Sequence, residues 1–234
     1  GNVGTSLTNA TALLDLAGPS GAITLTPASP VKAGSVALSL TLTEAVPAAP
    51  HLAYVTAAGS TVPVTLAGGG AAWTGDLAIT PGSDGLATFS LSATDALGNA
   101  GAALTSGGSF VIKTTAPGEP LFVRAIPQKA GAVRVSWSAP VSGTPASYSL
   151  YRDGVRISSG ITPLADGSGL FTDHPADGPY AYAAGAVDAA GNESALSTPV
   201  AATAKSVPPA APVGAGATFS AFGHIEVNWQ AGSP

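Results

Sequence analysis

A short motif that occurs twice whole and once in part constrains the fold of this chain more than any other feature. The whole copies are Asp95-Ala-Leu-Gly-Asn99 and Asp188-Ala-Ala-Gly-Asn192, and the chain opens on the last two letters, Gly1-Asn2. An alternating apolar and polar stretch precedes each whole copy. Gly and Asn tolerate the positive φ of tight turns, and Asp accepts hydrogen bonds from amides two residues on. The motif therefore predicts the same hairpin corner in successive β domains.

Two longer repeats indicate how large these domains are. Residues 98–105 resemble residues 1–8 after an interval of about 97 residues, which is the size of one immunoglobulin-type sandwich. Residues 225–229 repeat the alternation of residues 133–137 about 92 residues further on, with Trp at the end of both. The chain therefore contains successive copies of similar units.

Apolar residues alternate with polar ones throughout, which predicts strands with one buried face. Clear examples lie at 36–42, 87–93 and 133–137, and no stretch has a helical period. We therefore predict an all-β fold of tandem antiparallel β-sandwiches. The expected domains are the closing strand of a preceding sandwich, two whole sandwiches, and the start of a further one, at residues 1–17, 18–115, 116–206 and 207–234. We expect the chain to be part of a longer protein.

The composition excludes several kinds of function. Only 9% of the 234 residues are charged, and the formal net charge is −5, so no basic surface is expected to neutralise nucleic-acid phosphates. No apolar run approaches the ~18 residues that a membrane-spanning helix needs. The chain has no Cys, which excludes disulfide and thiolate chemistry and suits an exposed bacterial protein.

From Pro117 to Ser206 the chain resembles a bacterial fibronectin type III domain, and a second such domain starts within 208–234. The matching features are Trp137, Tyr148-Ser-Leu-Tyr-Arg-Asp-Gly154, Tyr180-Ala-Tyr182 and Ala186-Val-Asp-Ala-Ala-Gly-Asn-Glu-Ser194. In this comparison Tyr180 matches the tyrosine whose hydroxyl fastens one corner of the sandwich. Residues 18–115 are similar to bacterial immunoglobulin-like repeats that end in Asp-x-x-Gly-Asn. The resemblance implies spacers, adhesion modules or linkers in surface proteins and in secreted polysaccharide-degrading enzymes.

The sequence offers no pattern for catalysis, and we predict that the chain is not an enzyme. It contains neither a Gly-x-Ser-x-Gly nucleophile turn nor a His-Glu-x-x-His metal motif. His51, His174 and His224 fall in three different expected sandwiches, so they cannot converge on one metal within a domain. No cofactor is expected.

Calcium is the metal that the acidic loops could hold. The candidate ligands are Asp188, Asn192, Glu193, Asp166, Asp173 and Asp177. Calcium needs six to eight oxygen ligands, and these spacings do not match an EF-hand loop. The alternative is that each Asp caps a turn beside Gly167, Gly178 or Gly191. Both interpretations stay open at this point.

A sugar-binding platform would need exposed aromatic side chains. The parity of the alternation places Trp73, Trp137 and Trp229 inward, which leaves Tyr54 and Tyr151 as candidates for solvent exposure. A surface polysaccharide or a protein ligand is therefore an open partner, beside the neighbouring domains of the same chain.

These observations favour a non-catalytic structural or adhesive region of an extracellular or cell-surface bacterial protein. It would act as a semi-rigid spacer or stalk, because the connectors at 117–120 and 207–212 are rich in Pro. One alternative is a set of accessory modules, linking or carbohydrate-associated, in a secreted glycoside hydrolase. A further alternative is a filament subunit whose first strand, within residues 1–17, pairs with the sheet edge of a neighbouring molecule.

Overall fold

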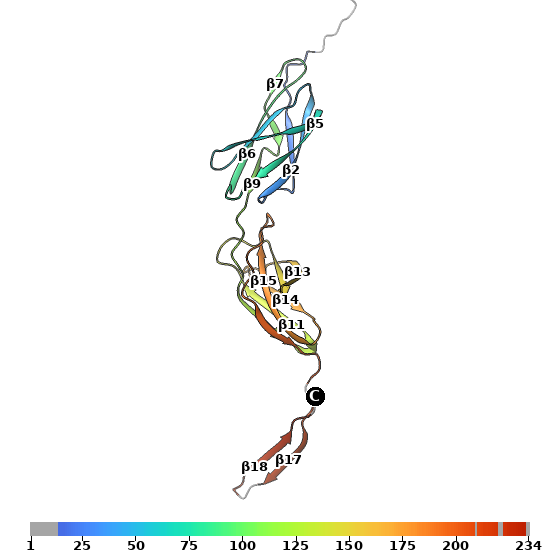
Figure 1. Ribbon diagram of the computed structural model, residues 1–234, viewed down its shortest axis with the longest axis vertical. Helices are drawn as coiled ribbons and strands as arrows, with labels where there is room; N and C mark the ends of the chain where they lie inside the picture. Colours follow the sequence, from blue (N-terminus) through green and yellow to red (C-terminus); the bar gives the residue numbers. More distant parts are fainter. Residues whose placement is uncertain (1–13, 209, 220–221, 233–234) are drawn as a thin grey trace, which may run out of the picture. The chain divides into compact units, whose positions relative to one another are not determined.

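The computed structural model describes residues 14–208, 210–219 and 222–232, and these residues form β-strands joined by turns and loops (Figure 1). The chain divides into two compact units, one ending at Ala116 and one starting at Pro117, with Ala189–Asn192 grouped with the first. Each unit contains a β-sandwich, so the predicted all-β fold is confirmed. Over the described ranges, no helix has the length and apolar character to cross a membrane.

The first unit is a sandwich of two sheets whose strands come from nine segments. One sheet has the order β5-β2-β1-β8, and the other has the order β4-β3-β6-β7, with β9 also paired to β6. The strands are β1 (Gly21–Thr26), β2 (Gly34–Val46), β3 (His51–Val55), β4 (Thr61–Val64), β5 (Leu66–Ile79), β6 (Gly85–Thr94), β7 (Ala100–Gly101), β8 (Leu104–Ser106) and β9 (Ser109–Ile112).

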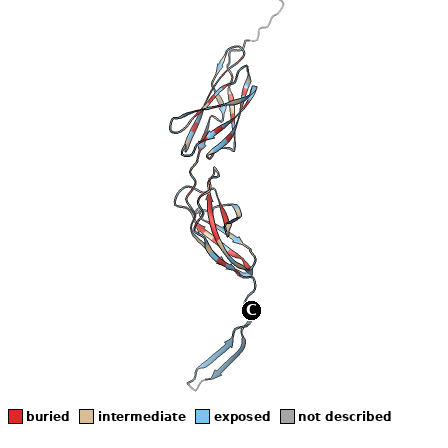
Figure 2. Ribbon diagram, in the orientation of Figure 1, coloured by how far each residue is buried: buried red, intermediate tan, exposed pale blue. Residues whose placement is uncertain are grey.

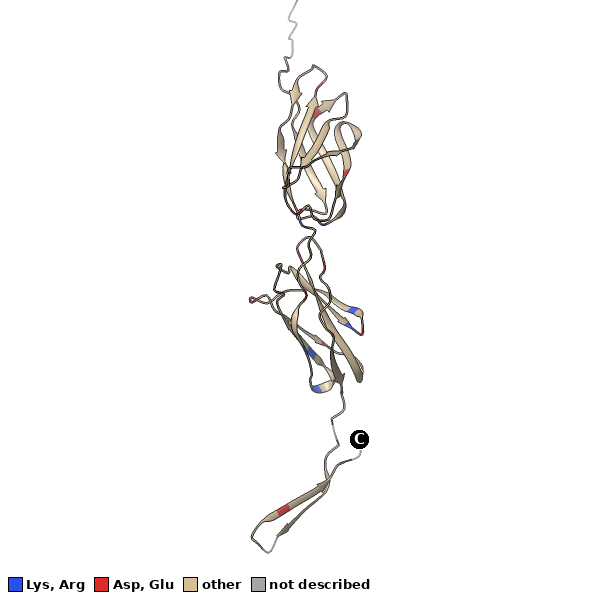
Figure 3. Ribbon diagram, turned by 60° about the vertical axis from the view of Figure 1, so that its left-hand side comes forward, with Lys and Arg blue, Asp and Glu red and all other residues tan. Residues whose placement is uncertain are grey.

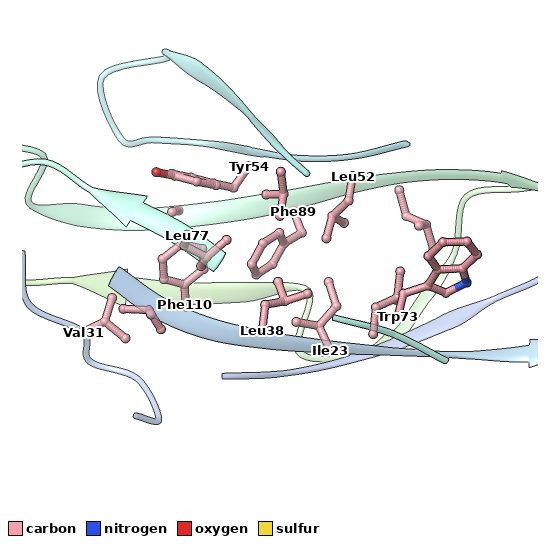
Figure 4. Packing of buried hydrophobic residues seen from close by; sticks show 14 of the residues in the cluster. Ile23, Val31, Leu38, Leu52, Tyr54, Trp73, Leu77, Phe89 and Phe110 are labelled. Carbon is pink, nitrogen blue, oxygen red and sulfur yellow. The ribbon is translucent and has the colours of Figure 1, made fainter. Parts of the chain in front are cut away.

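Alternation along the strands builds the core of this sandwich. In β2 every second residue from Val36 to Leu42 is buried, as the period of two predicts. Tyr54 and Phe110 meet edge to face within the core, with ring centroids 5.5 Å apart (Figure 4). The Tyr54 hydroxyl donates a hydrogen bond to the Ala78 carbonyl at 3.1 Å, which satisfies a polar atom inside the sandwich.

The edge position of Pro63 and the pairing of β1 with β8 are two local features of the first sandwich. Pro63 lies in β4, at the edge of its sheet, where the missing N–H removes no ladder bond. The strands β1 and β8 pair in parallel, in contrast to the predicted all-antiparallel pairing. This pairing is possible because a long chain segment separates the two strands, as parallel neighbours require. Residues 14–17 lie outside any strand, and the rest of the expected strand at 1–17 falls outside the described residues.

The second unit contains a sandwich of three strands against four. One sheet has the order β10-β11-β14 and the other the order β13-β12-β15-β16. All of these pairs are antiparallel, and the sandwich is fibronectin type III-like, as the resemblance implied. Its strands are β10 (Leu121–Pro127), β11 (Val133–Ser138), β12 (Ser147–Arg152), β13 (Val155–Ile161), β14 (Gly169–Asp173), β15 (Gly178–Val187) and β16 (Val200–Ala204).

The core of the second sandwich is built on aromatic residues from both sheets. Trp137 of β11 meets Tyr148 of β12 edge to face at 5.3 Å, and Tyr182 of β15 is fully buried beside them. The turn between β12 and β13 has positive φ at both Asp153 (52°) and Gly154 (77°), as a type I′ hairpin requires. The Asp-Gly pair favours this turn type, so the sequence and the observed dihedral angles agree.

The last described strands, β17 (Val213–Phe219) and β18 (Ile225–Gln230), pair as an antiparallel hairpin. Every residue of both strands is exposed, whereas buried residues alternate along the strands of the two sandwiches (Figure 2). Within the part of the chain that the structure describes, the hairpin therefore has strand pairing without a core.

Candidate functional site

The first copy of the repeated motif forms a corner held by Asp95. This carboxylate is only 5% exposed, and its Oδ1 accepts hydrogen bonds from the amides of Leu97 and Asn99, both at 2.8 Å. The Asn99 side chain donates to Oδ2, also at 2.8 Å, and Gly98 has a φ of +90°. Burial opposes ionisation of Asp95, but the hydrogen bonds from Asn99 and the loop amides outweigh it and lower the pKa. The corner predicted from the motif is therefore confirmed.

Two further carboxylates lie beside this corner. Oxygen atoms of Asp15, Glu44 and Asp95 all lie within 4.8 Å of one another. Partial burial, together with the negative charges of Asp15 and Asp95, raises the pKa of Glu44. The cluster concentrates negative charge beside the Asp95 corner. The corner already uses both oxygens of Asp95, so it has little capacity left for a cation that needs six to eight ligands.

Sequence reasoning did not find this cluster. It placed the candidate calcium ligands in the second sandwich, where one of these aspartates, Asp166, caps a turn. Asp166 accepts from the Ser168 amide at 3.0 Å and from its hydroxyl at 2.6 Å, and the hydroxyl bond is the main cause of its lowered pKa. Asp177 accepts from the amide of Ser206 at 2.7 Å. The bonds of Asp166 agree with the turn-capping alternative, whereas Asp177 holds a residue that is 29 positions away in the chain.

Asp173, the last residue of β14, joins the two sheets of the second sandwich. Its Oδ2 accepts hydrogen bonds from Arg152 at 2.7 Å and from the Tyr182 hydroxyl at 2.8 Å. The Arg152 guanidinium also lies over the Tyr180 ring, 5.1 Å from its centroid. Asp173 belongs to the three-stranded sheet and its two partners to the four-stranded sheet, so the network ties the layers together.

The remaining predicted ligands do not gather around a common point with these aspartates. Glu193 accepts from the Tyr151 hydroxyl at 2.8 Å and from Arg156 at 2.6 Å, while Asp188 is buried and Asn192 half-buried. Over the described residues, the three-carboxylate group at Asp95 is the sole cluster of metal-ligating acidic or His side chains. Calcium binding by the six predicted residues stays a prediction.

The expected aromatic surface differs from the observed one. Tyr54 is 2% exposed and therefore cannot serve as a sugar platform, because its ring lies in the core. Tyr151 is half-buried and engaged with Glu193 and Arg156. Trp73 and Trp137 are buried as predicted, but Trp229 is 62% exposed, because no described strand covers its face of the hairpin. The Tyr180 hydroxyl donates to the Ala176 carbonyl at 3.1 Å, which confirms the predicted corner tyrosine.

The three histidines lie in separate parts of the chain. His51 belongs to β3 of the first sandwich, His174 follows β14 of the second, and His224 lies in the turn of the last hairpin. They do not assemble a site.

Comparisons with known proteins give distant structural likenesses. No family model and no curated protein matches the sequence. Among solved structures, the chain is similar to the FN1–FN3 domains of chicken CNTN1, with 15% identity over 91% of this chain and 76% of that one, at a TM-score of 0.36. It is similar to fibronectin(III)-like modules of Clostridium thermocellum CbhA, with 15% identity over 77% and 92% of the two chains and a TM-score of 0.44. It is also similar to a 1.5-MDa bacterial ice-binding adhesin, with 18% identity over 85% and 66% and a TM-score of 0.41. These likenesses concern the fold alone.

Proposed function

We propose that this chain is a non-catalytic, semi-rigid spacer region of a bacterial cell-surface or secreted protein. The observation that carries the proposal is that successive sandwiches each close a hydrophobic core of their own. One core runs from Ile23 to Ile112 and the other from Val133 to Ala204. A module with its own core keeps its length regardless of what lies beside it, which is the property a spacer needs.

The start of the second unit supports limited bending at the connector. Pro117 and Pro120 are both buried, and the Gly118 amide donates to the Ser142 carbonyl at 2.9 Å. Pro fixes φ, and the hydrogen bond fastens the segment to its own sandwich, so few free dihedral angles are left there. Charged side chains are sparse along the chain (Figure 3). An exposed spacer with few charges attracts other molecules only weakly through electrostatics, which suits this function.

Small-angle scattering tests the spacer proposal. The native chain is compared with a variant that carries a Gly-Ser-Gly-Ser insertion between Ala116 and Pro117. We expect the insertion to broaden the distribution of interatomic distances, because it adds freely rotating residues to a constrained connector. A native chain that already scatters like the inserted variant would show a freely jointed connector and overturn the proposal. A calcium-chelator arm on the native chain tests whether the acidic loops contribute to stiffness.

A further inference from the structure

The outer face of the three-stranded sheet β10-β11-β14 carries a groove that the proposed spacer function does not use. Its floor is the central strand, which presents Ser136 and Ser138. One wall is Phe122 and Arg124 of β10, and the other is Leu170 of β14 with Leu164 from the loop before it. We call this the β11 groove. It is an open groove with a volume of about 500 Å³. It runs along β11, which is labelled in Figure 1.

The pairing register explains why a groove forms. Ser136 lies opposite Arg124 on one side and opposite Leu170 on the other. Side chains of paired residues stand on the same face of a sheet, so a small residue between two long ones leaves a trough. Serine hydroxyls line its floor, and they donate and accept hydrogen bonds.

The charge of the groove is unbalanced. Arg124 and Arg134 are diagonal neighbours on this face, because Arg124 lies opposite Ser136, two residues along β11 from Arg134. Both are exposed, and neither forms an ion pair with another described residue, whereas Arg152 and Arg156 are paired with Asp173 and Glu193. A bound carboxylate would give the two guanidinium groups a shared counter-charge and accept a forked hydrogen bond.

Phe122 adds an apolar platform beside Arg124. Its side chain is 77% exposed, and its φ is +49°, in a bulge where the register of β10 shifts. A bulky residue with positive φ is strained, and strain of this kind is concentrated at functional sites. Bulges also redirect side chains. The chain thus holds a large aromatic ring in solvent at the rim of the groove, at a cost in backbone energy.

We propose that the β11 groove binds an acidic polysaccharide, with a uronic-acid carboxylate on Arg124 and Arg134 and a sugar face on Phe122. An open trough with a hydroxyl floor suits a linear, hydroxyl-rich polymer better than a folded acidic protein, which needs a contact of about 800 Å² on each partner. Asp166 also lies at the groove, and its Oδ1 accepts from Ser168. Its negative charge favours a sugar hydroxyl at that end and places the carboxylate at the arginine end.

Calorimetric titration with hexagalacturonate tests the proposal, with the methyl-esterified hexamer as the uncharged probe of equal length. We expect saturable binding of the acid alone, and a loss of about tenfold or more for Arg124→Gln/Arg134→Gln. Phe122→Gly should weaken binding severalfold while leaving thermal stability equal or higher, since Gly accepts positive φ. Arg156→Gln, on the other sheet, should bind like the native chain.

Three outcomes would overturn the proposal. The first is no saturable binding of the acidic hexamer, and the second is an equal loss of affinity in Arg156→Gln. The third is binding of a hexaglutamate peptide as tightly as hexagalacturonate, which would show that the groove recognises negative charge alone or binds an acidic protein segment. None of these results bears on the scattering test of the spacer, so the two proposals fail separately.

Discussion

Two strands of this chain share one sequence pattern and differ in their surroundings. In β11 the residues Val133, Val135 and Trp137 are 0%, 0% and 3% exposed. In β18 the matching residues are Ile225 at 67%, Val227 at 56% and Trp229 at 62%.

The pairing of the two strands is the same in detail. Pro127 faces Val133 in the second sandwich as Phe219 faces Ile225 in the hairpin, and the register shift before Arg124 recurs before Gly216. Local sequence therefore fixes the strand, its partner and its bulge. Burial is set by the opposing sheet, which β11 has and which no described residues supply to β18 (Figure 2).

Removing the matched tryptophans should give the largest difference between the two strands. Trp137→Ala leaves a cavity against Tyr148, and we expect it to cost about 3–5 kcal/mol, a large share of the stability of one domain. Trp229→Ala should change the stability of the sandwiches by less than about 0.5 kcal/mol. Hydrogen exchange of β12 and β15, followed by mass spectrometry, reports the second sandwich alone. Equal protection in the two variants would refute the comparison.

The space beneath the Trp137 ring gives a smaller test. A Cβ added at Gly169, the residue paired with Trp137, would lie 2.2 Å from Cε2 of the indole. We expect Gly169→Ala to cost about 2–3 kcal/mol, because the ring must leave its position in a packed core. The control is Gly69→Ala, where an added Cβ meets nothing within 4 Å. Denaturant midpoints that shift equally in both variants would show that the ring has room to move.

The difference between local strand pairing and burial by a distant sheet also explains which features the sequence could predict. The Asp95 corner and the Asp153-Gly154 turn were predictable, because their hydrogen bonds or dihedral angles involve neighbours in the chain. Strand alternation was also predictable, but the inward placement of Trp229 was wrong, because parity defines a face and not what covers it.

The sites depend on contacts that no local pattern encodes. The cluster at Asp95 needs Asp15 and Glu44, which lie far away in sequence. The β11 groove combines Phe122 and Leu170 from two strands that flank a third. Only the sheet order brings such residues together, and that order is set by the whole core.

The hydrogen-bond network of Asp173, which joins the two sheets of the second sandwich, can be weakened by a substitution at the buried Tyr182. Its hydroxyl donates to Asp173, and Tyr182→Phe should cost about 1–2 kcal/mol at neutral pH. Burial, followed by the hydrogen bond to Asp173 and its charge, raises the pKa of Tyr182 far above the ordinary value of 10.0. The unfolded chain therefore releases this proton near pH 10 while the folded chain keeps it, so stability falls as the pH rises above that value.

Tyr182→Phe has no hydroxyl to ionise, so the variant lacks this loss of stability at high pH. We expect the stability gap between native chain and variant to shrink between about pH 10 and 11, as measured by urea midpoints. The raised pKa values of Tyr54 and Tyr148 act in the same direction in both proteins and cancel in the difference. A gap that stays constant with pH would show that Tyr182 ionises at the same pH in the folded and unfolded chains.

The smallest effect on stability should come from making the hairpin face polar. Ile225→Thr/Val227→Thr keeps β-branched side chains, so the strand is retained, and it removes apolar surface that is already in water. We expect the sandwiches to melt as in the native chain, while binding of a hydrophobic dye and self-association at high concentration both fall. The matched pair Val133→Thr/Val135→Thr should instead unfold much of the second sandwich, because it buries two hydroxyls in a dry core. If the hairpin pair also lowered the melting temperature, Ile225 and Val227 would have a partner in solution, and the difference between β11 and β18 would be one of degree.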